Sequence, residues 1–142
     1  MGTAKIMSLS TTPITSLVIS IATSVWNDVG SHLHQPVYCK SLLNAMRASR
    51  LLVHEHPLLI LRINDKTISE HSPDFIVQGM ETLIVNVLAT SAITQANVNT
   101  IQACVNAHRR AAGGVLINFG DHQRLTWMNI VQSQHKYYRS SM

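Results

Sequence analysis

The chain has 142 residues, which fits one domain able to bury a core of its own. Hydrophobic residues make up 46% of it and charged residues only 13%, against a usual charged share of about 25%. The hydrophobic content supports a globular protein, and the low charge predicts that another protein covers part of the surface. The net charge is +4, but the basic residues are scattered and aromatic residues make up 5%, which argues against a dedicated nucleic-acid-binding protein.

The sequence also indicates a compartment. Cys39 and Cys104 have no CxxC spacing, which predicts free thiols in a reducing compartment, although one disulfide is also compatible with them. The apolar run Ile14 to Val25 is shorter and more polar than the roughly 18 apolar residues that a membrane span needs. No secretory cleavage pattern follows Lys5. We therefore expect an intracellular protein, cytoplasmic or mitochondrial and not secreted. The first 27 residues lack acids, as a mitochondrial presequence would, but they also lack arginine.

Two helices are predicted near the N-terminus. Thr12-Pro13 suits a helix start, with Thr as the N-cap and Pro at the first helical position. Apolar residues at helical spacing carry this helix to Gly30, which suits the left-handed position after a helix end. A second helix is predicted from about Pro36 to Ser49.

Strands are predicted in the middle of the chain. Leu51 to Ile63 has the composition of one strand, which Pro57 interrupts, and a proline there indicates an edge strand or a bulge. After a turn at Asn64-Asp65, a return strand is expected to start at 67–69 and to continue over 74–77.

The stretch 82–120 predicts a βαβ unit. Leu83 to Ala89 is apolar on both faces, as in a central strand, and its alternation places Ile84, Asn86 and Leu88 on one face. A helix from Thr94 to Ala111 is followed by a buried strand over 114–119, and such a crossover makes the two strands parallel.

Two features are predicted at the ends of these elements. Arg109 and Arg110 would lie in the last turn of the crossover helix, which Gly113-Gly114 would end. Residues 124–134 would add a short helix or strand.

We therefore predict an α/β fold with a small mixed β-sheet of four to five strands, N-terminal helices and one crossover helix. Residues 1–142 would form a single domain, with an N-terminal segment (1–12), a core (14–131) and a tail (135–142).

The order and spacing of several segments resemble the GxxExxY family of the PD-(D/E)XK nuclease-like superfamily. Residues 114–120, GVLINFG, are similar to the family's G-L-L-I-N-F-G segment, and residues 74–77 to its D-L-V-V strand. Residues 84–89 fall where the family has I-V-E-L-K-A. Tyr38 matches the family's tyrosine, Gln102 its helix glutamine and Gly30 the glycine that opens a loop. The resemblance covers about residues 14–131 and implies a restriction-endonuclease-like core.

The resemblance also shows departures at the family's site positions. Gln35 and Asn86 stand where the family has glutamates, Leu88 stands at its lysine, and His32 at the first glycine of GxxExxY. Of the charged positions only Asp74 remains. Nucleases of this superfamily hold Mg²⁺ with acidic side chains, and their lysine positions or activates the water. The resemblance therefore implies a degenerate site with no catalytic residue, no metal and no cofactor.

The site residues also have purely structural interpretations. Asp74 is expected to bond nearby backbone or Gln102 rather than a metal, and Gln102 either lines the old pocket or bonds strand backbone. Tyr38 is expected to pack a helix on the sheet, and Asn118 to cap a strand end.

Two further groups of polar residues have the spacing or charge of ligands. The pairs at 32 and 34 and at 54 and 56 are histidines spaced to ligate Zn²⁺ with a cysteine, but surface histidines are the commoner case. The run His108-Arg109-Arg110 could contact phosphate, although a solvated helix end is commoner. There is no nucleophile-elbow motif of a serine hydrolase.

The predicted function is a non-catalytic structural or interaction subunit of a larger protein assembly or a homo-oligomer, with no membrane span. One alternative is a nucleic-acid-binding protein that keeps the nuclease groove without cleavage. The other alternative is a metal-dependent nuclease, in which Asp74 would still act.

Overall fold

The structure, a computed structural model, describes residues 12–132. The predicted N-terminal segment, apart from Thr12, and the tail from residue 135 lie outside these residues. Helix α1 (Pro13–Val29) begins as predicted, because the Thr12 side chain accepts a hydrogen bond from the Thr15 N–H at 3.3 Å. Gly30 follows the helix with φ of +76°, which glycine adopts without strain. Helix α2 (Gln35–Ala48) matches the second predicted helix within two residues.

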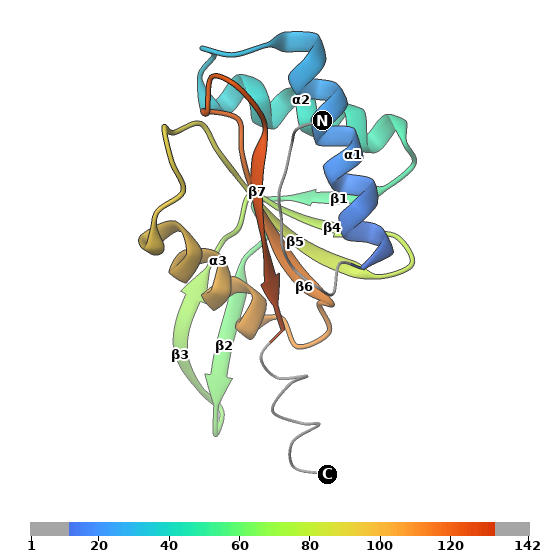
Figure 1. The fold of residues 1–142 in the computed structure, drawn as a ribbon. Helices are drawn as coiled ribbons and strands as arrows, with labels where there is room; N and C mark the ends of the chain where they lie inside the picture. The colour runs from blue at the N-terminus through green and yellow to red at the C-terminus, as the bar shows by residue number, and fades with distance from the viewer. Residues whose placement is uncertain (1–11, 133–142) are drawn as a thin grey trace.

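A five-stranded mixed sheet forms the centre of the molecule (Figure 1). Its strand order is β1-β4-β5-β6-β7, and only β5 and β6 run parallel. The strands are β1 (Leu52–Glu55), β4 (Phe75–Gln78), β5 (Thr82–Leu88), β6 (Gly113–Asn118) and β7 (Thr126–Val131). The predicted α/β fold, the parallel pair and the last element, which is a strand, are confirmed.

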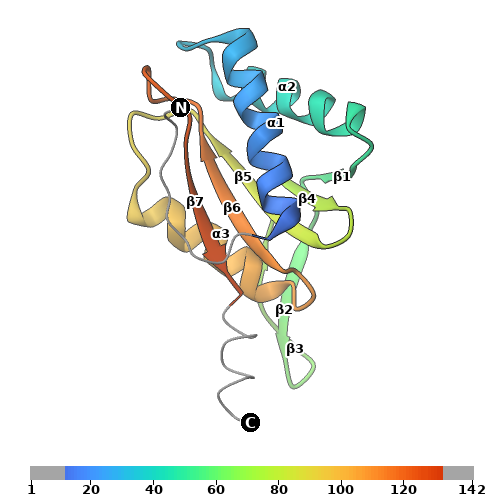
Figure 2. The same cartoon turned by 45° about the vertical axis from the view of Figure 1, so that its right-hand side comes forward.

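Helices cover both faces of this sheet (Figure 2). Helices α1 and α2 pack on the face that carries Leu83, Val85 and Val87 of β5. Helix α3 (Gln95–Ala107) packs on the opposite face, where Ile84 and Leu88 point. The alternation predicted for β5 is therefore confirmed, and it places Asn86 on the α3 face.

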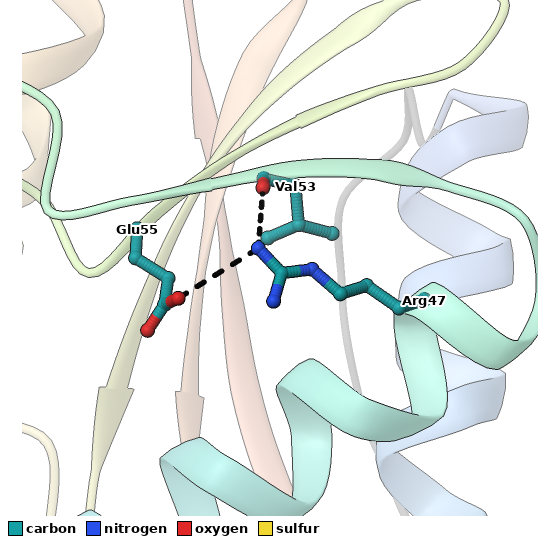
Figure 3. Close-up of polar contacts among 3 residues, drawn as sticks. All are labelled: Arg47, Val53 and Glu55. Atoms are coloured by element: carbon teal, nitrogen blue, oxygen red, sulfur yellow. Dashed lines mark hydrogen bonds and ion pairs between the residues drawn. The ribbon is translucent and has the colours of Figure 1, made fainter.

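Arg47 of α2 forms a hydrogen bond and an ion pair with the edge strand β1 (Figure 3). Arg47 Nη2 donates a hydrogen bond to the Val53 carbonyl oxygen at 3.1 Å and lies 3.7 Å from Glu55 Oε2. Both charged side chains are about half exposed, so the backbone hydrogen bond, more than the ion pair, fixes the position of α2 against β1.

The prediction of one interrupted strand over 51–63 is wrong. β1 belongs to the main sheet, whereas β2 (Leu59–Ile63) pairs with β3 (Lys66–His71) in a separate two-stranded sheet. The expected return strand is likewise two strands, β3 and β4, in different sheets. His56 takes a φ of +48° and Pro57 has no N–H, so the ladder stops there and the chain leaves the sheet.

The predicted end of the crossover helix is also wrong. α3 ends at Ala107, Arg109 and Arg110 lie in the following turn, and both glycines belong to β6. Packing explains the glycines, because a Cβ on Gly113 would lie 2.6 Å from the Ile130 carbonyl oxygen of β7. The two glycines thus let neighbouring elements approach β6 rather than ending a helix.

Candidate functional site

Asp74 and Asn86 lie opposite each other where the β4–β5 ladder ends. Phe75 pairs with Val85, so Asp74 and Asn86 occupy the next step of the antiparallel ladder. The Asp74 N–H donates to Asn86 Oδ1 at 2.9 Å, and the Val87 N–H donates to Asp74 Oδ2 at 2.7 Å. In both bonds a side-chain oxygen accepts a backbone N–H, so side chains link the start of β4 to β5 beyond the last paired residues of the ladder. The predicted bond from Asp74 to nearby backbone is confirmed, and the one to Gln102 is wrong.

Gln35, on helix α2, bonds the backbone of Val87 as well. Its Nε2 donates to the Val87 carbonyl oxygen at 3.1 Å and contacts Cys39 Sγ at 3.2 Å. Asp74 and Gln35 consequently bind the N–H and the C=O of Val87. The fold thus brings together three of the predicted site positions, Gln35, Asp74 and Asn86.

Burial controls the ionisation of this cluster. It raises the pKa of Asp74 above the usual value of 3.8, and the Val87 N–H and the charge of His56 oppose that rise only in part. Burial also raises the pKa of Cys39 to about 12, with the charge of Asp74 as a smaller cause. A thiol with such a pKa stays protonated at neutral pH and is a poor nucleophile.

Leu88 and Tyr38 take part in packing instead. Leu88 packs against the apolar cluster between the sheet and α3. Tyr38 is fully buried, stacks on Phe119 and donates its hydroxyl to the Gly30 carbonyl oxygen at 2.7 Å. The predicted helix-to-sheet role of Tyr38 is confirmed. His32, in the same loop, has a φ of +72°, a conformation that glycine adopts more readily.

Gln102 is not part of the cluster. Its Nε2 donates to the Val131 carbonyl oxygen at 3.2 Å and to Asn106 Oδ1 at 3.0 Å. Val131 pairs with Gly113, and Gly113 with Leu83, so Gln102 lies at the opposite end of the sheet from Asp74. Of its two interpretations, a buried amide bonded to strand backbone is correct for the bond, but the Gln102 side chain is only partly buried.

Asn118 and the histidine pairs have other partners. Asn118 closes the end of β6 as predicted, because its amide bonds the Thr90 N–H, the Thr90 carbonyl and the Gly120 N–H. His32 stacks on His122 with ring centroids 4.0 Å apart, and His54 Nε2 bonds Gln78 Oε1. Within residues 12–132 no three His, Cys, Asp or Glu side chains lie together so that they could hold a metal ion.

Comparison with known families agrees with this geometry. A model of the PD-(D/E)XK nuclease superfamily matches residues 12–130, which is most of the chain. The chain belongs to the PD-(D/E)XK nuclease superfamily. No curated protein and no solved structure shows a significant match to it. In residues 12–132 no helix is long and apolar enough to cross a membrane.

The name of the superfamily contains two short sequence motifs, PD and (D/E)XK. Pro73-Asp74 directly precedes β4, and Asn86-Val87-Leu88, at the end of β5, lies across the ladder from it. Sequence reasoning missed Pro73, although the dipeptide before β4 was a usable signal. It also missed Cys39 and the backbone of Val87, whose roles depend on contacts between distant segments.

A Mg²⁺ ion, which this superfamily implies, does not fit these residues. Mg²⁺ prefers charged oxygen ligands at short, near-octahedral distances. The cluster offers one carboxylate, whose Oδ2 already accepts the Val87 N–H. Asn86 Oδ1 already accepts the Asp74 N–H, and Gln35 directs an N–H group toward Val87. A cation here would gain a single negative charge, from a cluster in which two of the side-chain oxygens already accept backbone N–H groups.

Proposed function

We propose that this chain is a non-catalytic member of the superfamily and serves as a structural or interaction subunit of a larger protein assembly. The observation that supports the proposal is Leu88, which stands at the lysine position in the resemblance to the GxxExxY family and packs against apolar side chains. Leucine has no proton to transfer and no charge to stabilise a developing phosphoryl charge. Asn86, at the acidic position, adds no charge either.

The resemblance to the GxxExxY family supports the same conclusion. Its tyrosine is kept as the buried Tyr38, whereas its glutamate is replaced by Gln35. The framework of that segment persists while the charge is gone. A chain under selection for phosphodiester cleavage would be expected to keep the charge.

The β2–β3 hairpin supports an interaction role. Three aliphatic side chains are exposed on it or beside it: Leu58 (61% exposed), which directly precedes β2, Ile63 (55%) and Ile68 (56%). Two-stranded sheets are marginally stable alone in water, and Leu59 anchors this one to the cluster beneath α3. Exposed aliphatic groups on such a projection suit a protein partner better than a nucleic acid, which requires positive charge.

A cleavage assay tests the non-catalytic part. Single- and double-stranded DNA and RNA would be incubated with the chain and Mg²⁺ or Mn²⁺, beside the Asp74→Ala variant. We expect no cleavage above that of the variant. Cleavage that Asp74→Ala abolishes would overturn the proposal. A gel shift at low salt that weakens steeply with added salt would support the nucleic-acid-binding alternative instead.

Native mass measurement tests the assembly part. The protein purified from its source is expected to run as a complex, and a stable monomer would contradict the proposal. The double variant Ile63→Ser and Ile68→Ser should lose the complex if the hairpin carries the contact. Met80→Ser is the matched control, because Met80 is 94% exposed in the turn between β4 and β5.

A further inference from the structure

We infer that hydrogen bonds have taken the place of a cation at the end of the β4–β5 ladder, so that this chain folds without divalent metal and Asn86 is the residue responsible. This rests on the proposed function, because it takes Asp74 and Asn86 as the two acidic positions of the superfamily motif. It goes further by stating what the changed residues now do.

The side chains of Asp74 and Asn86 each accept a backbone N–H across the ladder. Asp74 gives its N–H to the Asn86 side chain, and its own side chain accepts the N–H of the following residue, Val87. Both side chains are partly buried, where an unpaired donor or acceptor would be costly. The two side chains therefore hold β4 against β5 beyond Phe75, where the paired strand begins.

An amide at position 86 matters because of charge. Asp74 stands directly across the ladder, and like charges at such cross-strand positions repel. A glutamate at 86 would place a second carboxylate beside Asp74, and the pair would need a cation or a proton. Asn86 keeps an oxygen for the Asp74 N–H and removes the repulsion.

Gln35 extends the neutral arrangement to the helix layer. Its amide N–H is bonded to the Val87 carbonyl oxygen at 3.1 Å, and residue 35 lies 52 positions from residue 87. A carboxylate there could not donate to that carbonyl. The two amides thus leave Asp74 as the single charge of the cluster, and they tie α2, β4 and β5 together without an ion.

Thermal unfolding of the full chain in EDTA and in millimolar Mg²⁺ or Mn²⁺ tests this inference. We expect the midpoint of the wild type to be the same in all three. Asn86→Glu is expected to unfold about 3–5 °C lower in EDTA and to recover most of that loss with Mn²⁺. Asn86→Gln is the matched neutral control, which should show a loss that Mn²⁺ does not reverse.

Each outcome decides the inference. A wild-type midpoint that Mg²⁺ or Mn²⁺ raises, and that Asp74→Asn makes insensitive, would overturn it. The inference would also be overturned if the unfolding midpoint of Asn86→Glu were the same with and without Mn²⁺. If Asn86→Glu does not fold in EDTA, refolding from urea with Mn²⁺ supplies the readout, with Asn86→Asp as a second variant. Failure of both to refold with Mn²⁺ counts against the inference.

The proposed function can fail separately. A wild type that cleaves nucleic acid while showing no ion-dependent midpoint would overturn the non-catalytic role and leave the hydrogen-bond replacement standing. If the ions stabilise the wild type but it cleaves no nucleic acid, the hydrogen-bond replacement is overturned and the non-catalytic role stands.

Discussion

The ring of Tyr38 lies on the ring of Phe119 with centroids 4.6 Å apart and planes 14° apart. Tyr38 comes from α2, and Phe119 directly follows β6. The Tyr38 hydroxyl also donates to the Gly30 carbonyl oxygen and accepts the Leu33 N–H. One side chain therefore joins a helix, the central sheet and the loop between α1 and α2.

Removing the Tyr38 hydroxyl should loosen that loop. Tyr38→Phe keeps the stacked ring but leaves two backbone groups without their partner, at a cost of about 1–3 kcal/mol of unfolding free energy. Tyr38→Ala also loses the ring and should cost about 3–5 kcal/mol. Urea unfolding monitored by circular dichroism measures both. Equal losses for the two variants would show that the stacked ring adds nothing.

Asp74→Asn should stabilise the chain at neutral pH. Burial raises the pKa of Asp74 in the folded state, so the folded chain binds the proton more tightly than the unfolded chain. The contribution of Asp74 to stability is therefore greatest at acid pH and falls as the pH rises above 3.8 through the folded pKa. Asparagine avoids this loss and can still accept the Val87 N–H.

Unfolding of wild type and Asp74→Asn measured from pH 3 to pH 7 checks the sign. The variant should be the more stable at pH 7, and the difference should shrink toward pH 3. Asp65→Asn, in the exposed turn between β2 and β3, is the control and should change little at either pH. A variant less stable than wild type at pH 7 would refute the expectation.

Both cysteines should resist labelling in the folded chain. Burial raises the pKa of Cys39 to about 12 and that of Cys104 to about 11, from 9.0. Thiolate populations at pH 8 then fall by about 1000-fold and about 100-fold. A thiol reagent should react slowly without denaturant and rapidly in urea, with absorbance as the readout. Rapid reaction of either thiol in the native chain would contradict this.

The two glycines of β6 should respond differently to alanine. At Gly113 a Cβ would meet the backbone oxygen of Ile130 at 2.6 Å, and at Gly114 it would meet the Val105 side chain at 2.7 Å. Side chains yield more readily than a neighbouring strand. Gly113→Ala should therefore cost more than Gly114→Ala, both within about 1–3 kcal/mol.

Gly79→Ala is the control for these glycines. A Cβ there would meet only side-chain carbons of Leu51 and Ile14, at 3.3 and 3.4 Å. Urea unfolding of the three variants should place Gly79→Ala closest to wild type. A Gly114→Ala variant less stable than Gly113→Ala would show that β7 adjusts more easily than α3.

The sequence predicts those helices and strands that are determined by residues within the element itself. The apolar run of β5 and the Thr12-Pro13 start of α1 are examples, because propensity and burial act there within a few residues. The departure of β2 from β1 was not predictable from Pro57 alone, since that proline equally suits a bulge. The link from Gln35 to Val87 spans 52 positions, so only the folded chain reveals it.

Glu55 pairs with Phe75, and the His56 N–H donates to the Asp74 carbonyl oxygen at 2.9 Å. The chain therefore leaves the main sheet after Glu55 and returns to it beside the same point, at Phe75, and the β2–β3 hairpin lies between. A short connector in place of residues 57–72 would therefore keep the β1–β4 ladder. Loss of this projection would remove the exposed aliphatic side chains and would also uncover the part of the apolar cluster that Leu59 contacts beneath α3.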